Sequence, residues 1–174
     1  MRFALTLTLL FAVGTAGAQA DPGNERPQSA PQMTVDPQAT AFGHPGNAKD
    51  VTRDIHLSLR DTMSIVPDRL NLVQGETVRL RIKNIGRIPH EFVLGTRKEI
   101  LEHRDMMRKM PTMQAAEAND VSVSPGETSE IIWRFSNLGS FEYACLVPGH
   151  WEAGMQGVVT VTARPSRERP AKPR

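Results

Sequence analysis

The chain has a single cysteine, Cys145, among its 174 residues, so it forms no intramolecular disulfide. After residue 20 it also has no apolar run long enough to span a bilayer, and we expect no transmembrane segment in the mature chain. The segment 164–174 carries five basic residues and one acidic residue but no aromatic residue. This composition is typical of a disordered basic tail, and the lack of aromatic residues argues against nucleic-acid binding.

The first 20 residues have the pattern of an export signal. A basic residue precedes a short apolar run, 3–13, and the small residues Ala18 and Ala20 have the spacing that a signal peptidase recognises. We predict that residues 1–20 are a cleaved signal peptide, with a retained membrane anchor as the alternative. A lone cysteine is unusual in an exported protein, because oxidising compartments favour paired cysteines. Cys145 is therefore a buried thiol, an intermolecular partner, a nucleophile or a metal ligand.

The rest of the chain divides into three segments. Residues 21–48 are rich in Pro, Gln, Gly, Ala and Asn and have few large apolar side chains. Such a composition does not bury enough surface to offset the entropy of ordering, so we expect a flexible leader. Residues 49–163 are predicted to form one domain, followed by the basic tail 164–174. We expect a monomer.

Short runs of alternating apolar and polar residues fill most of the domain. Ile55, Leu57 and Leu59 alternate with polar residues, and turns such as 124–127, which contain glycine or proline, separate the runs. Period-two strands with turns at short intervals predict an all-β fold, an antiparallel Greek-key β-sandwich or barrel. The other predicted strand segments are 78–82, 92–94, 121–123, 130–135, 141–145 and 158–161.

One segment breaks the alternation. Residues 98–110 consist largely of helix-forming residues, and Ile100 is the single β-branched residue among them. Pro111 ends this pattern, because the residue before a proline avoids helical dihedral angles. We therefore predict one short helix that is inserted between two strands.

Soft and borderline metal ligands are concentrated near the end of the domain. Cys145, His150 and Met155 follow the pattern Cys-x4-His-x4-Met, and His90 stands at the start of an upstream strand. Two imidazoles, one thiolate and a weak axial thioether are the ligand set of a mononuclear blue-copper site. Because His90 comes from a distant strand, the fold would keep such a site rigid.

Each of these residues has an ordinary structural alternative when it is taken alone. His90 could be a strand-end histidine, Met155 a core residue and Cys145 a buried thiol. Their joint occurrence in an all-β, exported chain favours copper. Zinc would accept a similar set, but structural zinc sites use more thiolates and have no use for a thioether.

The segment 54–162 resembles the cupredoxins, the blue-copper family that includes plastocyanin, azurin and rusticyanin. The likeness rests on the turn 84–86 before His90 and on a Cys, a His and a Met in one loop before the last strand. The Cys-x4-His-x4-Met spacing is found in some subfamilies and not in plastocyanins, whose loop is shorter. The family also bonds the thiolate through a backbone N–H near the first His, and Glu91 follows that residue here. By this likeness the copper ligands are His90, Cys145, His150 and Met155.

A narrower resemblance is also visible. The segments 42–46, 90–95 and 145–155 are similar to bacterial periplasmic cupredoxins of the CopI type, a subfamily associated with copper tolerance. This similarity implies a periplasmic location and a role in copper tolerance.

A second group of metal-binding side chains lies in the predicted helix. His103, Met106, Met107 and Met110 share one helical face, and Met113 follows after the helix. Thioether and imidazole are ligands of Cu(I), so these residues are a candidate second copper site. The alternative is that the methionines form the apolar face that packs on the barrel.

Two main functions follow from these expectations. The first is a periplasmic type 1 copper protein that cycles between Cu(II) and Cu(I), transfers single electrons, takes part in copper tolerance, or does both. The alternative is a copper-sequestering or copper-delivery protein that uses the Met/His site and carries no electrons. An enzyme is disfavoured, because copper enzymes resemble fused cupredoxin domains with a second set of copper ligands. The expected partner is a redox protein or a copper-handling protein.

Overall fold

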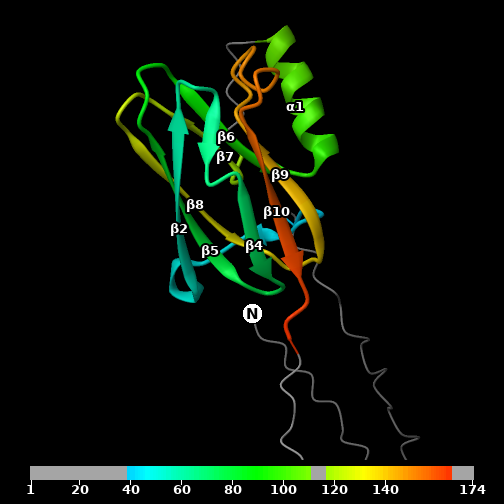
Figure 1. Ribbon diagram of the computed structural model, residues 1–174. Coiled ribbons are helices and arrows are strands. Elements are labelled where there is room, and N and C mark those ends of the chain that lie inside the picture. Colours follow the sequence, from blue (N-terminus) through cyan, green and yellow to red (C-terminus); the bar gives the residue numbers. More distant parts are fainter. Residues whose placement is uncertain (1–38, 111–116, 166–174) are drawn as a thin grey trace, which may run out of the picture. The chain divides into compact units, whose positions relative to one another are not determined.

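The computed structural model describes residues 39–110 and 117–165. These residues form two five-stranded β-sheets, with one α-helix outside them (Figure 1). The predicted all-β sandwich with one helical insert is confirmed. The strands are β1 (His44–Pro45), β2 (Arg53–Arg60), β3 (Ser64–Val66), β4 (Arg69–Val73), β5 (Thr77–Asn84), β6 (His90–Gly95), β7 (Asp120–Val123), β8 (Thr128–Arg134), β9 (Gly139–Ala144) and β10 (Gln156–Thr162), and the helices are α1 (Arg97–Lys109) and a short 3-10 helix (Ala48–Asp50).

The chain crosses between the two sheets. One sheet has the order β1-β8-β5-β2-β3, and the other has the order β4-β10-β9-β6-β7. Most neighbouring strands are antiparallel, as predicted, but β2 pairs with β5 and β4 pairs with β10 in parallel. These two parallel pairs depart from the antiparallel pairing expected from the sequence. The chain passes to the second sheet at β4 before it returns, and this crossover lets β5 run in the same direction as β2.

Alternating side chains fill the space between the sheets. In β2, Ile55, Leu57 and Leu59 are buried, and the residues between them are more exposed. Tyr143 is fully buried in β9, and its hydroxyl donates a hydrogen bond of 2.7 Å to the carbonyl of Pro67. The period-two pattern of the sequence therefore identifies the core face of β2.

The packed domain begins before the predicted residue 49. Phe42 is fully buried, and its ring stacks on Trp133 with 4.9 Å between the ring centroids. β1 also pairs with β8. An aromatic side chain in the core anchors this stretch, which composition alone assigned to the leader 21–48. The predicted signal peptide, most of the leader and most of the basic tail lie outside the described residues.

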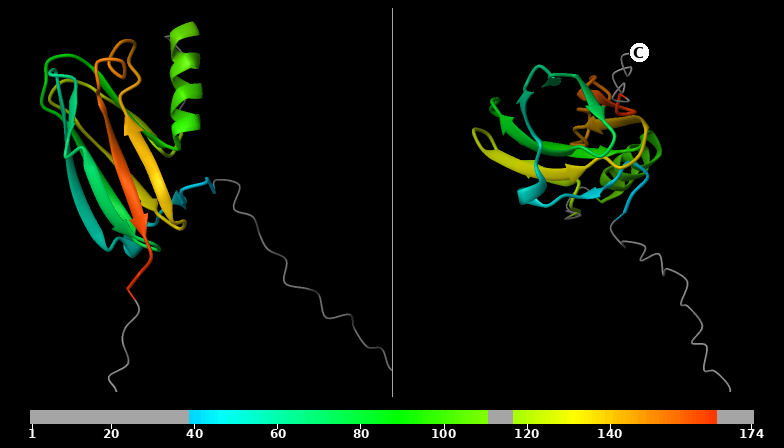
Figure 2. Two further views of the ribbon diagram at one scale, coloured as in Figure 1. Left: turned by 45° about the vertical axis from the view of Figure 1, so that its right-hand side comes forward. Right: turned by 90° about the horizontal axis from the view of Figure 1, so that it is seen from below.

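β6 is buried on both of its faces. All six of its residues are buried, because its inner face packs in the main core and its outer face lies under α1 (Figures 1 and 2). Beneath the helix, Ile100 packs with Val93, Ala144 and Leu146 in a second, smaller apolar cluster. Successive residues of β6 therefore point alternately into the main core and toward the helix.

α1 begins and ends within one residue of the prediction. It spans Arg97–Lys109, with Thr96 as its N-cap, rather than 98–110. Thr96 and Glu99 form a capping box, in which the Thr96 N–H donates to the Glu99 carboxylate at 2.7 Å and the Glu99 N–H donates to the Thr96 hydroxyl. In the part of the chain that the structure describes, no helix has the length and apolar character needed to cross a membrane.

Gly157 offers a direct test of the core packing. A Cβ atom at this position would overlap the ring of Tyr143, its partner in β9. Gly157→Ala is therefore expected to lower the free energy of unfolding by about 1–3 kcal/mol, the usual cost of overpacking. Gln156→Ala, at the exposed neighbouring position, is the control and should change it by less than about 0.5 kcal/mol. Denaturant titration measures both values, and a Gly157 variant as stable as the parent would contradict this packing.

Candidate metal centre

Cys145, His150 and Met155 lie in one closed loop between β9 and β10. Cys145 is the residue directly after β9 rather than its last residue. The Cys145 N–H donates to the carbonyl of Met155, and the Met155 N–H donates to the carbonyl of His150, both at 3.0 Å. Gly149 and Gly154 have positive φ angles of 90° and 96°, which side chains disfavour. The loop thus folds back on itself, as the Cys-x4-His-x4-Met spacing requires.

His90 meets this loop from the first position of β6. Its Nδ1 lies 3.8 Å from the Cys145 Sγ, and the His150 Nδ1 lies 3.3 Å from the same sulfur. The two imidazole rings are 5.1 Å apart between centroids. One ligand atom from each of these three residues lies within 4.8 Å of the others. Met155 is fully buried in the same core cluster as Cys145.

The sulfur of Cys145 is enclosed by the fold. It is fully buried and accepts a hydrogen bond of 3.3 Å from the backbone N–H of Glu91. Burial raises the pKa of the Cys145 thiol to about 11, although the amides of Glu91 and Val147 act in the opposite direction. Such a thiol keeps its proton at neutral pH unless a metal ion replaces it. One sulfur and two imidazole nitrogens are donors that copper accepts together.

A carboxylate orients the His90 ring. Asp61 Oδ1 lies 3.3 Å from the His90 Nε2, a distance that suits an Nε2–H donor and would leave the Nδ1 lone pair facing Cys145. The backbone N–H of Arg87 donates to the other Asp61 oxygen at 2.8 Å and lowers the pKa of this carboxyl group. Burial and the nearby His90 lower the pKa of His150, which favours the neutral ring that binds metals.

Asn84 fixes the loop that leads into β6. Its fully buried side chain donates to the carbonyls of Ile88 and Val123, at 2.8 and 3.0 Å, and accepts from the N–H of Gly86 at 2.9 Å. Gly86 is required there, because a Cβ atom would overlap the Asp61 carboxylate. These contacts set the position of the first residue of β6 relative to β5 and β7.

Residues 54–162, more than half of the chain, match the family described as copper binding proteins, plastocyanin/azurin family. The chain belongs to this cupredoxin family. The family expected from the sequence, and copper as its cofactor, are confirmed. This cupredoxin is 43% identical over 157 residues to the copper-resistant cuproprotein CopI of Rubrivivax gelatinosus. The aligned residues cover 90% of this chain and 93% of the relative.

A second relative and a solved structure extend the comparison. The cupredoxin is 33% identical over 151 residues to the copper-resistant cuproprotein CopI of Vibrio cholerae, covering 86% of this chain and 89% of the relative. The crystal structure of reduced auracyanin from Roseiflexus castenholzii is similar with a TM-score of 0.56 and 18% identity, covering 64% of this chain and 98% of that one. The structural likeness shows the cupredoxin fold alone.

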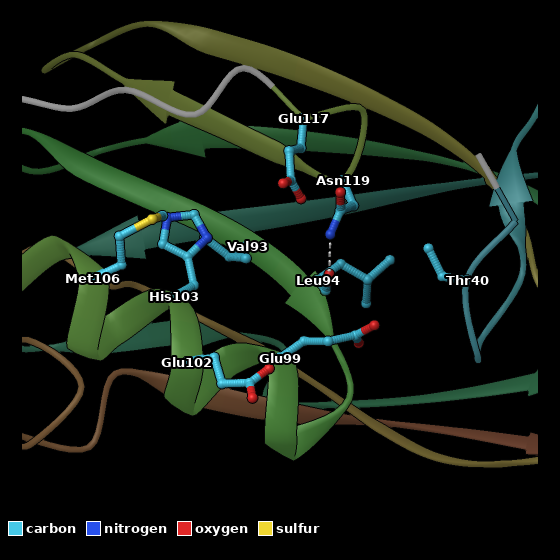
Figure 3. A pocket seen from close by; sticks show the side chains of 9 residues that line it. All are labelled: Thr40, Val93, Leu94, Glu99, Glu102, His103, Met106, Glu117 and Asn119. Carbon is cyan, nitrogen blue, oxygen red and sulfur yellow. Dashed lines mark hydrogen bonds between the residues drawn. The ribbon is translucent and has the colours of Figure 1, made fainter. Parts of the chain in front are cut away.

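The predicted Met/His face of α1 is divided in the structure. Met107 is buried, whereas Met110 is 46% exposed. His103 and Met106 line a cavity of about 280 Å³ on the outer side of β6 (Figure 3). Met113 lies outside the described residues. Binding of Cu(I) by this set stays a prediction.

Sequence reasoning missed two residues that position the centre. Asn84 was noted only as part of a turn, and Asp61 was not noted at all. Asp61 lies just beyond the end of β2, where Leu59 pairs with Asn84 in the neighbouring strand β5. The local sequence shows only an acidic residue in a turn. Its position beside His90 follows from the parallel pairing of β2 and β5.

Asn84→Ala tests whether this side chain determines the architecture around the centre. The change removes three hydrogen bonds of a fully buried side chain and leaves the carbonyl of the buried Val123 without this donor, so the free energy of unfolding should fall by about 2–4 kcal/mol. Asn137→Ala is the matched control, because the Asn137 side chain is exposed and, among the described residues, donates only to the carbonyl of Ala41 at 3.0 Å. Its loss should cost less than about 1 kcal/mol. Denaturant unfolding of the metal-free protein gives both values, and equal losses would contradict a special role for Asn84.

Proposed function

We propose that His90, Cys145, His150 and Met155 bind one copper ion as a type 1 site. The observation that carries this proposal is the approach of two imidazole Nδ1 atoms to one fully buried cysteine sulfur, at 3.3 and 3.8 Å. Met155 would supply a thioether ligand, because its backbone is hydrogen-bonded to both other loop ligands. When bound, copper supplies one-electron exchange between Cu(II) and Cu(I).

The surroundings of the site favour a fixed arrangement of the ligands. The Glu91 N–H contacts the Cys145 sulfur, and Asp61 contacts the far side of the His90 ring. Both contacts tie the ligands to strands of the sandwich or to the turns at their ends. Little rearrangement is then needed when an electron arrives or leaves. The same burial keeps water and oxidants away from the thiolate.

The proposed physiological role is copper tolerance in the periplasm. The two CopI relatives, at 43% and 33% identity, are named for copper resistance and match most of this chain. The signal-peptide pattern in residues 1–20 supports export. A buried thiolate site that takes up copper would lower the concentration of the reactive free ion. We propose no enzymatic activity, because the chain has one cupredoxin domain, whereas copper enzymes of this type resemble several fused domains.

Electron transfer is the second candidate function. His150 is partly exposed, and its neighbours Pro148, Gly149 and Ala153 are exposed and small or apolar. A patch of this kind suits brief docking to a redox partner through a small interface. Electron transfer and copper tolerance are compatible, whereas a purely sequestering protein would bind copper without exchanging electrons with a partner.

Cys145→Ser tests the copper assignment. The copper-loaded parent should show an intense visible absorption band from the thiolate–copper bond, and the variant should lose it, because a hydroxyl replaces the sulfur. Optical titration with Cu(II) measures the band. His56→Gln, at an exposed position of β2, is the control and should keep it. A copper-loaded parent without this band would overturn the type 1 assignment.

Growth in copper separates the two candidate roles. Cells without the gene should be more sensitive to added copper than the parent strain, and the wild-type gene should restore growth. The gene encoding Cys145→Ser should not restore it, because its product lacks the thiolate. Growth curves over a series of copper concentrations provide the measurement. Normal growth of the deletion strain in excess copper would contradict copper tolerance and leave electron transfer as the proposed role.

A further inference from the structure

Glu91, His103 and Asp120 form a second group of metal-ligating side chains, on the outer face of β6 under α1. The His103 Nε2 lies 3.9 Å from a carboxylate oxygen of Glu91 and 3.9 Å from one of Asp120. One ligand atom of each residue lies within 4.8 Å of the other two. The three residues come from β6, α1 and the first position of β7. The fold therefore brings together ligands that are distant in the sequence.

Strand register and helix packing explain why Glu91, His103 and Asp120 lie close together. Asp120 pairs with Val93, two residues after Glu91, so Glu91 and Asp120 are diagonal neighbours on one face of the sheet. His103 follows Ile100 by one helical turn, and Ile100 is fully buried against Val93. The imidazole is thereby turned toward the two carboxylates.

The three side chains are buried without sufficient hydrogen-bond partners. The side chains of Glu91, His103 and Asp120 are only 8%, 10% and 5% exposed. Within residues 39–110 and 117–165, no hydrogen-bond partner reaches Oε2 of Glu91, Nε2 of His103 or Oδ1 of Asp120. Buried polar atoms are normally satisfied, so an unpartnered atom on each of three clustered ligand side chains indicates a missing ion or water. The 3.9 Å from the His103 Nε2 to one oxygen of each carboxylate is too long for a direct hydrogen bond but leaves room for a cation.

The charge balance of this group favours a cation. Burial raises the pKa of Asp120 to about 8, and the neighbouring carboxylates of Glu91 and Glu117 act in the same direction. Burial also lowers the pKa of His103, so its ring does not readily supply a compensating positive charge. A neutral imidazole nitrogen is, however, a good metal donor. A divalent cation would neutralise the carboxylates and use this nitrogen.

A cavity lies beside His103, one member of the group. It has a volume of about 280 Å³, and the His103 ring stands in its wall beside the sulfur of Met106 (Figure 3). The carboxylates of Glu99, Glu102 and Glu117 also line it. Three acidic residues around this cavity would raise the concentration of cations next to His103.

We propose that Glu91, His103 and Asp120 bind a divalent transition-metal cation, Cu(II) or Zn(II). One nitrogen donor and two carboxylate donors suit these ions, whereas Cu(I) prefers softer sulfur ligands. Three protein ligands leave a further position for water. The site shares His103 with the Met/His set expected from the sequence, but its other ligands are carboxylates. It is an addition to the type 1 site and does not rest on the function proposed for that site.

Calorimetric titration of Zn(II) into protein loaded with one equivalent of copper per chain tests the proposal. Copper already occupies the thiolate centre, and the visible band reports that it stays there. The parent should bind one further Zn(II) per chain. Asp120→Asn and His103→Gln should lose this binding and keep the band, because each removes one ligand of the second site. Glu102→Gln, which changes a cavity carboxylate outside the group, should bind Zn(II) like the parent.

Several results would overturn the second site. Failure of the parent loaded with one equivalent of copper to take up either Zn(II) or further Cu(II) would mean that only water and protons occupy the group. Unchanged Zn(II) binding in both Asp120→Asn and His103→Gln would place the ion elsewhere. The variant with Met106, Met107 and Met110 all changed to Leu should still bind Zn(II), and loss of binding there would assign the ion to the methionine face. Thermal unfolding of every variant shows whether each is folded.

Competition identifies the ion. Cu(II) binds nitrogen and oxygen donors more tightly than Zn(II) in the usual order of divalent metals. Added Cu(II) should therefore displace Zn(II) from the second site without increasing the thiolate band, which would make copper the preferred ion. Retention of Zn(II) under these conditions would make the site a zinc site.

Discussion

The hydrogen bond from the Glu91 N–H to the Cys145 sulfur, at 3.3 Å, joins the residues of the two proposed metal sites. It forms because β6 and β9 pair as far as Val93 and Ala144, and the chain leaves β9 at the next residue. The sulfur then turns toward the start of β6. On that strand His90 faces the main core, and the Glu91 carboxylate faces the helix. A register shift of one residue would exchange the two side chains and remove both arrangements.

Features encoded in short segments were predictable. The period-two runs indicated the sandwich, and the Cys-x4-His-x4-Met spacing indicated one closed ligand loop. The start of α1 was also encoded locally, because Thr96 and Glu99 have the spacing of a capping box, which marks a helix beginning at residue 97. Phe42 shows the limit of composition, since one aromatic residue in a polar segment was enough to anchor that segment in the core.

Features that depend on long-range pairing were not predictable from one sequence. Asp61 reaches His90 only because β2 and β5 run parallel and end side by side. Helical spacing grouped His103 with methionines, yet the sheet beneath the helix determines its nearest polar neighbours. Glu91 and Asp120 become its neighbours through the register of β6 and β7, which no local pattern reveals.

The two regions differ in ligand chemistry in a way that a copper protein can use. The inner group offers sulfur and imidazole, which accept both oxidation states, whereas the outer group offers carboxylates and one imidazole, which favour divalent ions. Glu91 belongs to both, through its backbone N–H on one side and its carboxylate on the other. A cation bound by the Glu91 carboxylate would shift the position of Glu91, whose N–H donates to the Cys145 sulfur. Hydrogen bonds to a metal ligand tune the properties of the metal. A cation in the outer group would therefore change the hydrogen bond to the Cys145 sulfur without any larger movement of the fold.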